Sequence, residues 1–367
     1  EEVYGIGCDL IVSCGTNRVV FSDVLVGEVW WCSGQSNMQV TLWGEPSRIN
    51  HANRDLNGYL ESVMTVEMSV RGATVPRVWS VRRQLSGGRL EWKPFAGPSL
   101  RDFSAISFHY ALALHRKLKV PVGVICSAWG GSKIEPWISP SGFAAVPGLE
   151  RFSGVEPKQE PADAGRLSEE ERQEFRQQPT VVYNAMVAPY VPYAVRGVVW
   201  YQGESNLPDV EDYPRLMQAL YATLTRAFEN ERLPLEFVQL APFHYGWRES
   251  LGPLALGRFW QAQARFADEQ PNADMVVICD VGEIGNIHPV DKRTVSLRLA
   301  AQALNRVYGR REVPCQFPRF RSCRNENGVC SLEFDGVTDW YYRSDEPVRF
   351  ELAGANGKFL SATVSFA

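Results

Sequence analysis

The sequence GEVWWCSGQSNMQ, residues 27–39, joins an apolar run to a polar turn. Its first half is rich in β-branched and aromatic residues (Val29, Trp30 and Trp31) and predicts a buried strand. The strand leads directly through Gly34 to Ser36. Parallel α/β proteins place their ligands at such junctions, outside the carboxyl ends of the strands. The stretch therefore predicts the first strand of a parallel sheet, with Ser36 exposed at its end.

Four more segments have the same apolar character: residues 121–129, 197–203, 235–243 and 274–282. Helical patterns lie between and around them, at residues 104–119, 181–192, 213–232, 258–270 and 292–310. Several of the strands lack polar alternation, which is typical of strands covered on both faces. Strands that alternate with helices form parallel sheets. We predict a three-layer α/β/α fold with a central parallel sheet of about five strands.

Three regions depart from this alternation. Residues 45–87 and 154–180 are inserts that we predict to lie on the surface, and Ser168 and Glu171 in the second insert match a capping box for one exposed helix. After residue 311 the pattern changes to Pro, Gly and short strands at residues 330–334 and 348–352, followed by a hairpin turn at residues 355–358. The predicted organisation is terminal strands of a β-rich region at 1–26, a main domain at 27–310 and a small β-rich appendage at 311–367.

Charge and hydropathy argue against two classes of protein, nucleic-acid binders and membrane-spanning proteins. The chain has 38 Lys plus Arg against 42 Asp plus Glu, a net charge of -4. This balance argues against nucleic acid as a partner, because binding to phosphates requires a surplus of cations. The longest apolar runs, such as residues 275–279, are far shorter than the roughly 20 residues of a membrane span. We therefore expect neither a nucleic-acid partner nor a membrane span.

The eight cysteines fall into two groups. Cys32, Cys126 and Cys279 lie in apolar runs and are predicted to be buried thiols. The others lie among Gly, Asn, Arg and Pro, which suits short disulfide-closed loops in an oxidising compartment; they are Cys8 with Cys14, Cys315, and Cys323 with Cys330. No CxxC pair occurs, so we expect no zinc site. These cysteines favour an exported protein, secreted, lysosomal or periplasmic, and leave the cytoplasm open.

Ser36 has two interpretations. Backbone N–H groups at a strand-to-helix turn can stabilise a developing oxyanion, so a serine there is a candidate nucleophile. Serine is also a favoured N-cap residue, and capping alone would explain its place.

Polar groups follow two further predicted strands. Gly130 and Gly131 come after the strand at residues 121–129, where a glycine N–H can approach a ligand closely. Gln202, Glu204 and Asn206 follow the strand at residues 197–203. Partly buried polar groups need partners, so this cluster indicates a function: Asn206 is a candidate oxyanion donor, and the other two bind substrate or hold the loop.

His288 follows the last predicted strand and precedes the last predicted helix. Its imidazole suits general-base chemistry near neutral pH. A single histidine is more often structural, but this one is predicted at the same edge of the sheet as Ser36, Gly131 and Asn206.

These four blocks resemble those of the SGNH hydrolases, which contribute Ser, Gly, Asn and His in this order. More narrowly, the sequence is similar to the sialic acid acetylesterase (sialate O-acetylesterase) family over about residues 20–310. The matching blocks are GEVW at 27–30, CSGQSNM at 32–38, WGG at 129–131, YNAM at 183–186, residues 198–206 and IHP at 287–289. The resemblance implies a flavodoxin-like fold and a carboxylic ester hydrolase.

The resemblance also implies a mechanism and a substrate, an O-acetylated sialic acid or sialoglycan with the 9-O-acetyl group favoured. Ser36 attacks the acetyl carbonyl and His288 accepts its proton, and the oxyanion is held by the N–H groups of Ser36 and Gly131 and by Asn206. No metal or organic cofactor is implied. Four residues are candidates for substrate binding: Gln35, Gln202, Glu204 and Trp129.

One position departs from the SGNH pattern, because Gly285 stands where these enzymes carry an aspartate, three residues before the histidine. Either a backbone carbonyl near Gly285 orients the imidazole of His288 in a Ser-His dyad, which we favour, or a carboxylate does so. The nearest carboxylates in sequence are Asp280, Glu283 and Asp291.

Two other functions remain open. One keeps the chemistry and changes the sugar, as an esterase of acetylated xylan or another polysaccharide. The other is a non-catalytic sugar-binding protein with the hydrolase fold, for which Ser36 beside an imidazole would have no use.

Overall fold

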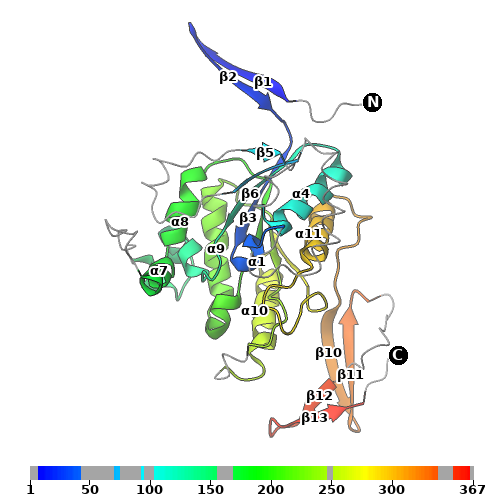
Figure 1. The fold of residues 1–367 in the computed structure, drawn as a ribbon. Coiled ribbons are helices and arrows are strands. Elements are labelled where there is room, and N and C mark those ends of the chain that lie inside the picture. The colour runs from blue at the N-terminus through cyan, green and yellow to red at the C-terminus, as the bar shows by residue number, and fades with distance from the viewer. Residues whose placement is uncertain are drawn as a thin grey trace. The chain divides into compact units, whose positions relative to one another are not determined.

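A computed structural model describes residues 7–42, 70–74, 92–94, 103–154, 168–245, 251–337 and 350–363. The chain divides into two compact units, Glu1–Pro314 and Cys315–Ala367. The first unit contains the seven-stranded sheet and every helix among the described residues (Figure 1).

A seven-stranded sheet forms the centre of the first unit, in the order β5-β4-β6-β3-β7-β8-β9. Five parallel strands confirm the prediction; they are β3 (Glu28–Gly34), β6 (Val122–Ala128), β7 (Gly197–Tyr201), β8 (Leu235–Val238) and β9 (Ala273–Val276). The last two end earlier than predicted, at residues 238 and 276 instead of 243 and 282. Two strands were not predicted: β4 (Val70–Thr74), parallel to β6, and β5 (Lys93–Pro94), antiparallel to β4.

Strand β4 corrects the prediction that the whole insert at residues 45–87 lies on the surface. Residues 70–74 extend the sheet by pairing with Val122–Cys126 of β6. Without β4, the N–H and C=O groups on that side of β6 would lack strand partners. The remainder of this insert lies outside the described residues.

Helices cover both faces of the sheet, which confirms the three-layer prediction. Figure 1 shows α8 (Val181–Met186) and α9 (Tyr213–Ala227) on one side of β3 and β6, and α4 (Ala105–Leu118) and α11 (Lys292–Arg306) on the other. The remaining predicted helix is α10 (Ala255–Glu269), which packs beside α9. Helix α8 ends earlier than predicted and is followed by a 3₁₀ turn, η4 (Ala188–Tyr190).

Adjacent tryptophans of β3 show why this strand lacks polar alternation. Trp30 packs edge-on against Tyr110 of α4, with ring centroids 5.3 Å apart. Trp31 points to the opposite face, 5.4 Å from the ring of Phe228 at the end of α9. Both tryptophans are fully buried. A helix layer on each face therefore makes every position of the strand a core position.

The charged insert at residues 154–180 contains the predicted capped helix, α7 (Glu169–Arg176). The Ser168 hydroxyl accepts from the N–H of Glu171, and the Glu171 side chain accepts from the N–H of Ser168. Residues 155–167 lie outside the described residues. Between β6 and this insert lie η2 (Glu135–Trp137), α5 (Pro140–Ala144) and α6 (Glu150–Ser153).

Three antiparallel hairpins complete the described structure. The first unit begins with β1 (Cys8–Cys14) and β2 (Asn17–Val24). The described part of the second unit contains two hairpins, β10 (Arg319–Glu326) with β11 (Val329–Asp335) and β12 (Phe350–Ala353) with β13 (Phe359–Ala362), in agreement with the predicted strands and turn. No helix in the described part of the chain is long and apolar enough to cross a membrane.

The structure does not support the disulfides predicted within the hairpins, because Cys8, Cys14, Cys323 and Cys330 are free thiols. Cys8 and Cys14 stand at opposite ends of β1. Six residues of extended chain span roughly 20 Å, so these two cysteines cannot bond to each other. Cys323 pairs across its hairpin with Leu332, two positions from Cys330. Such diagonal neighbours are about 7–8 Å apart, beyond the usual reach of a disulfide.

Two of the three thiols predicted to be buried are so. Cys32 and Cys126 lie opposite each other on β3 and β6, in the core. Cys279 is exposed, because β9 ends at Val276 and the chain has left the sheet before it reaches this residue.

Candidate active site

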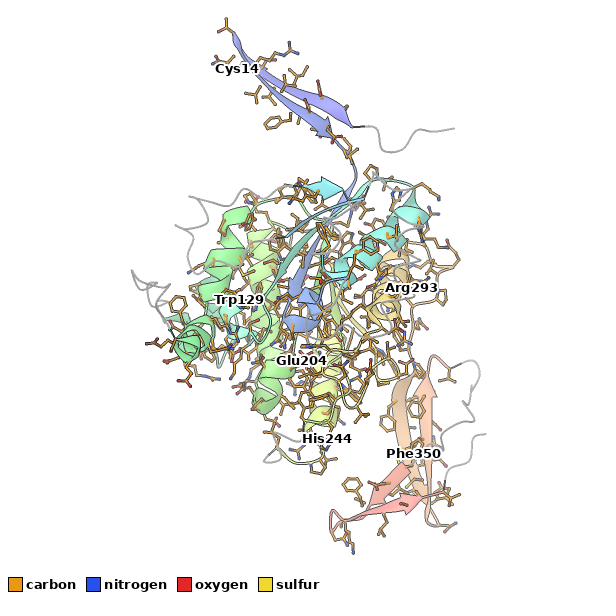
Figure 2. All side chains as sticks on the ribbon, viewed as in Figure 1. Cys14, Trp129, Glu204, His244, Arg293 and Phe350 are labelled. Atoms are coloured by element: carbon orange, nitrogen blue, oxygen red, sulfur yellow. The ribbon has the colours of Figure 1, made fainter. Side chains whose placement is uncertain are left out.

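The carboxyl ends of β3, β6 and β7 lie side by side. Gly34 is in register with Ala128 of β6 and with Tyr201 of β7. The segments that leave the sheet there are therefore neighbours: the Ser36 turn, the Gly130–Gly131 loop and the loop from Gln202 to Asn206. Figure 2 shows the side chains of Trp129 and Glu204 at this end of the sheet.

Ser36 is the first residue of the short helix α1 (Ser36–Gln39), and Gln35 occupies the N-cap position without a side-chain capping bond. The structure thus does not use Ser36 as the cap, which removes the alternative explanation for this serine. The first N–H groups of a helix have no intrahelical acceptor, so the N–H of Ser36 is open to a ligand. The Ser36 side chain is half-buried.

The Gly130–Gly131 loop lies directly against this turn. A Cβ placed on Gly130 would lie 3.3 Å from the Cβ of Ser36, closer than most side chains allow. The N–H of Gly130 donates to Oε1 of Gln39, 2.6 Å away. Among the described residues, no acceptor binds the N–H of Gly131, which leaves this group as the oxyanion donor that the loop can offer. The Gly131 carbonyl accepts from Nε2 of Gln177, at 2.7 Å.

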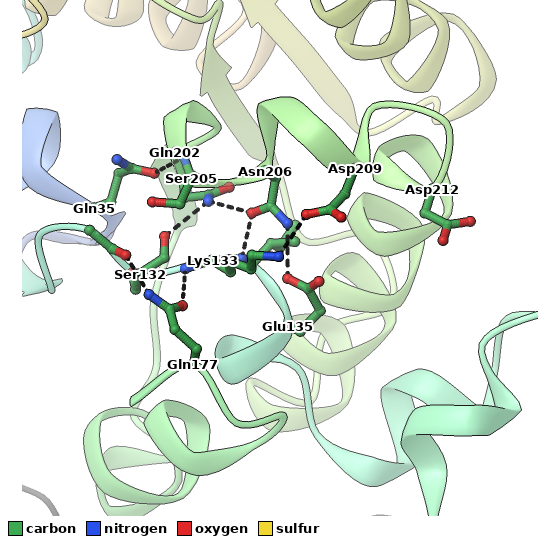
Figure 3. A network of polar contacts seen from close by, with 12 residues as sticks. Gln35, Ser132, Lys133, Glu135, Gln177, Gln202, Ser205, Asn206, Asp209 and Asp212 are labelled. Atoms are coloured by element: carbon green, nitrogen blue, oxygen red, sulfur yellow. Dashed lines mark hydrogen bonds and ion pairs between the residues drawn. The ribbon is translucent and has the colours of Figure 1, made fainter. Parts of the chain in front are cut away.

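Asn206 lies in the 3₁₀ helix η5 (Glu204–Asp209), which follows β7, and it is fully buried. Its Oδ1 accepts from the N–H of Ile134 (2.9 Å) and from Nε2 of Gln202 (2.8 Å). Its Nδ2 donates one hydrogen to Oε2 of Glu135, also at 2.9 Å. These bonds fix the orientation of the amide and leave the second Nδ2 hydrogen for another acceptor. Figure 3 shows this network.

Glu135 is a functional candidate that the sequence did not reveal. It is buried, and desolvation raises the pKa of its carboxyl, an effect that the hydrogen bond from Asn206 opposes. Gln39 and Gln177 were missed in the same way. In the described part of the chain their side chains form hydrogen bonds with backbone groups of Gly130, Gly131 and Lys133, and such bonds have no sequence signal beyond the proximity of Gln39 to Ser36.

His288 lies half-buried in the loop between β9 and α11. The side chain of Asn286 accepts from the backbone N–H of His288, at 3.0 Å. The carbonyl of Ile287 accepts from Nδ2 of Asn37, also at 3.0 Å. Because Asn37 follows Ser36 and Ile287 precedes His288, this bond joins the serine turn directly to the histidine loop.

The three carboxylates nearest to His288 in sequence each have another partner. Asp280 forms a two-bond ion pair with Arg298, with both N–O distances at 2.6 Å. Glu283 accepts from the N–H of Val290, and Asp291 caps α11 by accepting from the N–H of Thr294.

The four candidates for substrate binding are all buried. Oε1 of Gln35 faces the N–H groups of Gly203 and Ser205, at 3.3 and 3.4 Å. Gln202 bonds to Asn206 as described, and Glu204 accepts from Asn37. Trp129 follows β6 directly, and its backbone N–H donates to the carbonyl of Gly34.

The described residues contain no cluster of three or more His, Cys, Asp or Glu side chains placed to hold a metal ion. What the site does present is a half-buried hydroxyl at a helix N-terminus, two backbone donors and an oriented amide. An imidazole-bearing loop is tied to the same turn. Such an arrangement can activate a nucleophile and stabilise an oxyanion.

The central parallel sheet, with helices on both faces, matches the fold of a solved carbohydrate acetylesterase. A family model described as "Carbohydrate esterase, sialic acid-specific acetylesterase" matches residues 26–277, more than two thirds of the chain. The chain belongs to this family. Ser36, Gly131 and Asn206 lie within the matched range, and His288 lies beyond it.

Individual relatives agree with the family. The chain is 31% identical to the sialate O-acetylesterase of Mus musculus, over 85% of this chain and 63% of the relative. It is 30% identical to the Homo sapiens enzyme, over 81% and 56%. The chain thus spans about three fifths of the length of these relatives. A crystal structure of a carbohydrate acetylesterase from Xanthomonas citri superposes with a TM-score of 0.78 at 28% identity, covering 98% of this chain and 74% of that one.

Proposed function

We propose that this protein is a serine esterase that removes O-acetyl groups from sialic acids, with the 9-O-acetyl ester as the favoured substrate. The observation that carries the proposal is the hydrogen bond from Asn37 to the carbonyl of Ile287, which holds the histidine loop against the serine turn. Membership of the sialic acid-specific acetylesterase family supports the choice of substrate.

In the proposed first step, Oγ of Ser36 attacks the acetyl carbonyl carbon while the imidazole of His288 accepts the hydroxyl proton. The carbonyl oxygen becomes an oxyanion. The N–H groups of Ser36 and Gly131 and the second Nδ2 hydrogen of Asn206 donate to it. These donors are fixed before the reaction, so they stabilise the charge without reorganising.

The tetrahedral intermediate then collapses. The bond between the acetyl carbon and the sugar oxygen breaks, and His288 returns its proton to that oxygen, so the sugar leaves as an alcohol. Ser36 now carries the acetyl group. Water, deprotonated by His288, attacks this ester, and acetate leaves as the Ser36 hydroxyl is restored.

We propose that a backbone carbonyl at Gly285 or Asn286 orients His288, which makes a Ser-His dyad. In support, Asp280, Glu283 and Asp291 are each engaged by another group. We further propose that Gln35, Gln202 and Glu204 hold the loops rather than bind the sugar, since all three are buried and bonded to loop atoms.

The test is acetate release from 9-O-acetylated sialic acid. We expect Ser36→Ala and His288→Ala to lower kcat/KM by about a thousandfold or more. Ser153→Ala, which alters a half-buried serine on α6, serves as the matched control and should retain wild-type activity. Retention of activity by Ser36→Ala would refute the nucleophile assignment, and binding of the sugar without turnover by the wild-type chain would favour a sugar-binding protein.

Asp291→Asn tests the dyad in the same assay. Asparagine also caps helices well, so α11 should be preserved and activity should stay near that of the wild type. A loss as large as that of His288→Ala would show that Asp291 completes a triad.

A broader sugar specificity is the second candidate, because the structure from Xanthomonas citri is described only as a carbohydrate acetylesterase. Acetylated xylan is the comparison substrate. We expect kcat/KM for acetylated sialic acid to be at least tenfold higher, about 1.4 kcal/mol of transition-state discrimination. A smaller preference would contradict a dedicated sialate esterase.

A further inference from the structure

The side chain of Asn37, the residue after Ser36, contacts two other buried polar side chains, those of Glu204 and Lys292. Asn37 is fully buried, and Glu204 and Lys292 are 3% and 5% exposed. Nδ2 of Asn37 donates to Oε1 of Glu204 at 2.5 Å, and Nζ of Lys292 donates to Oδ1 of Asn37 at 2.6 Å. The amide of Asn37 thus lies between an acidic and a basic side chain.

This arrangement allows one orientation of the amide. A lysine amino group donates and a carboxylate accepts, so Oδ1 must face Lys292 and Nδ2 must face Glu204. The second hydrogen of Nδ2 then points to the carbonyl of Ile287, at 3.0 Å. The other carboxylate oxygen of Glu204 has no hydrogen-bond partner among the described residues, so Asn37 is the side chain that holds this group.

Burial of the ionisable groups of Glu204 and Lys292 costs folding free energy, because it removes them from water. Desolvation raises the pKa of Glu204, against the effect of its hydrogen bonds and of Lys292. Desolvation lowers the pKa of Lys292 to about 7, opposed by Glu204, Glu283 and Asp291. The ring of Tyr201, 5.8 Å from Nζ, forms another side of the lysine pocket. Buried pairs of this kind seldom add net stability compared with apolar side chains, so stability alone gives little reason for these three residues.

The cluster binds both ends of the segment from Ile287 to Lys292, which contains His288. Asn37 binds the carbonyl of Ile287 at one end, and Lys292, the first residue of α11, binds Asn37 from the other. Asn37 itself adjoins Ser36 in α1. One amide therefore fixes the histidine loop relative to the serine.

We propose that Asn37, Glu204 and Lys292 are positioning residues that set the placement of the His288 imidazole relative to Ser36. This inference rests on the proposed function, because it takes Ser36 and His288 as the reacting pair. The three residues act through the backbone of the loop and of α1. General-base transfer requires the two groups to be within hydrogen-bond reach, and a misplacement of about 1 Å costs roughly a hundredfold in rate.

The first test uses Lys292→Met, with Arg293→Met as its matched control. Arg293 is the next residue of α11 and is exposed, so its replacement removes a cation from the same turn without touching Asn37. For Lys292→Met we expect kcat for acetate release to fall at least tenfold while KM stays within about twofold. We expect Arg293→Met to match the wild type. A folded Lys292→Met variant with wild-type kcat would overturn the proposal.

The second test separates positioning from folding. Asn37→Asp replaces the donor that faces both Glu204 and Ile287. Adding Glu204→Gln gives residue 204 a donor for the new carboxylate, but the carbonyl of Ile287 still faces an acceptor. We expect the double variant to regain the melting temperature lost by Asn37→Asp while kcat stays at least tenfold low. Recovery of kcat together with stability would show a purely structural role.

The two proposals fail in different ways. A wild-type chain that releases no acetate, or whose activity survives Ser36→Ala, defeats the proposed function. A wild-type chain whose activity depends on Ser36 and His288, but whose kcat is unchanged in folded variants of this cluster, defeats only the positioning role.

Discussion

His109, on α4, is a buried histidine remote from the proposed chemistry in sequence, and only 3% of it is exposed. Desolvation lowers the pKa of its imidazole to about 4. Arg293 and Arg116 act in the same direction, and Asp291 acts against them. In the unfolded chain a histidine titrates near pH 6.5. The folded protein thus holds His109 neutral over a range in which the unfolded chain protonates it.

This difference predicts acid sensitivity. Between pH 6.5 and 4 the unfolded state binds more protons, so stability falls as the pH falls. The contribution of His109 is fully present above pH 6.5, and up to about 3 kcal/mol is lost by pH 4. We expect His109→Gln, which cannot protonate, to lose correspondingly less stability over this range. Urea unfolding at several pH values measures this, and equal slopes in both proteins would contradict it.

At the same scale, the site separates into residues that the sequence reveals and residues that it hides. Ser36, Gly131 and Asn206 follow strands directly, so the order of elements is enough to bring them to one edge. Asn37 and Lys292 are different, because a buried polar residue is explained only by its partners. Those partners, Glu204 and Ile287, are more than 150 residues away from Asn37 in sequence.

Strand β3 approaches β7 so closely that its last residue can only be glycine. Gly34 has a φ of 143°, and a Cβ there would lie 2.1 Å from the carbonyl oxygen of Tyr201. The same approach lets the N–H of Gln35 donate to that oxygen, at 3.0 Å. The glycine thus sets the point at which the chain leaves the sheet and begins α1.

Two glycine substitutions test this conclusion. Gly34→Ala should destabilise the protein by about 3 kcal/mol or more, because backbone atoms cannot move away from the new methyl group. Gly257 is exposed within α10, where a Cβ meets nothing within 4 Å. Gly257→Ala should therefore stabilise the protein by about 0.5–1 kcal/mol. Chemical denaturation measures both, and a Gly34→Ala variant as stable as the wild type would contradict the geometry.

Elements could be predicted where a continuous apolar run identified them. The five central strands and five helices could be predicted from such runs and from apolar residues that recur every four positions, as Leu216, Leu220 and Leu224 do. Strand β4, with the sequence VRGAT, has no such run, and its place in the sheet depends on pairing with β6. Likewise, Cys8 and Cys14 are close in sequence, but the extended strand between them places them far apart.

Across the whole molecule, the central sheet and the hairpins differ in how much buried apolar surface stabilises them. Five strands of the central sheet, β3, β6, β7, β8 and β9, contribute side chains to one hydrophobic core that includes Trp31, Trp200 and Phe237. The hairpins β1–β2, β10–β11 and β12–β13 are two-stranded, and most of their residues are exposed, including Leu10 and Phe320. A two-stranded hairpin on its own is at best marginally stable in water.

Amide hydrogen exchange should therefore divide the chain in two. Opening of the central sheet requires disruption of the core, so amides of β3, β6 and β7 should exchange at the rate of global unfolding. Amides of the hairpins should exchange at least a hundredfold faster, through local opening of a single ladder. Mass spectrometry of peptides after timed exchange gives both rates in one experiment. Hairpin amides as protected as those of β3 would mean that surfaces beyond their own ladders stabilise the hairpins.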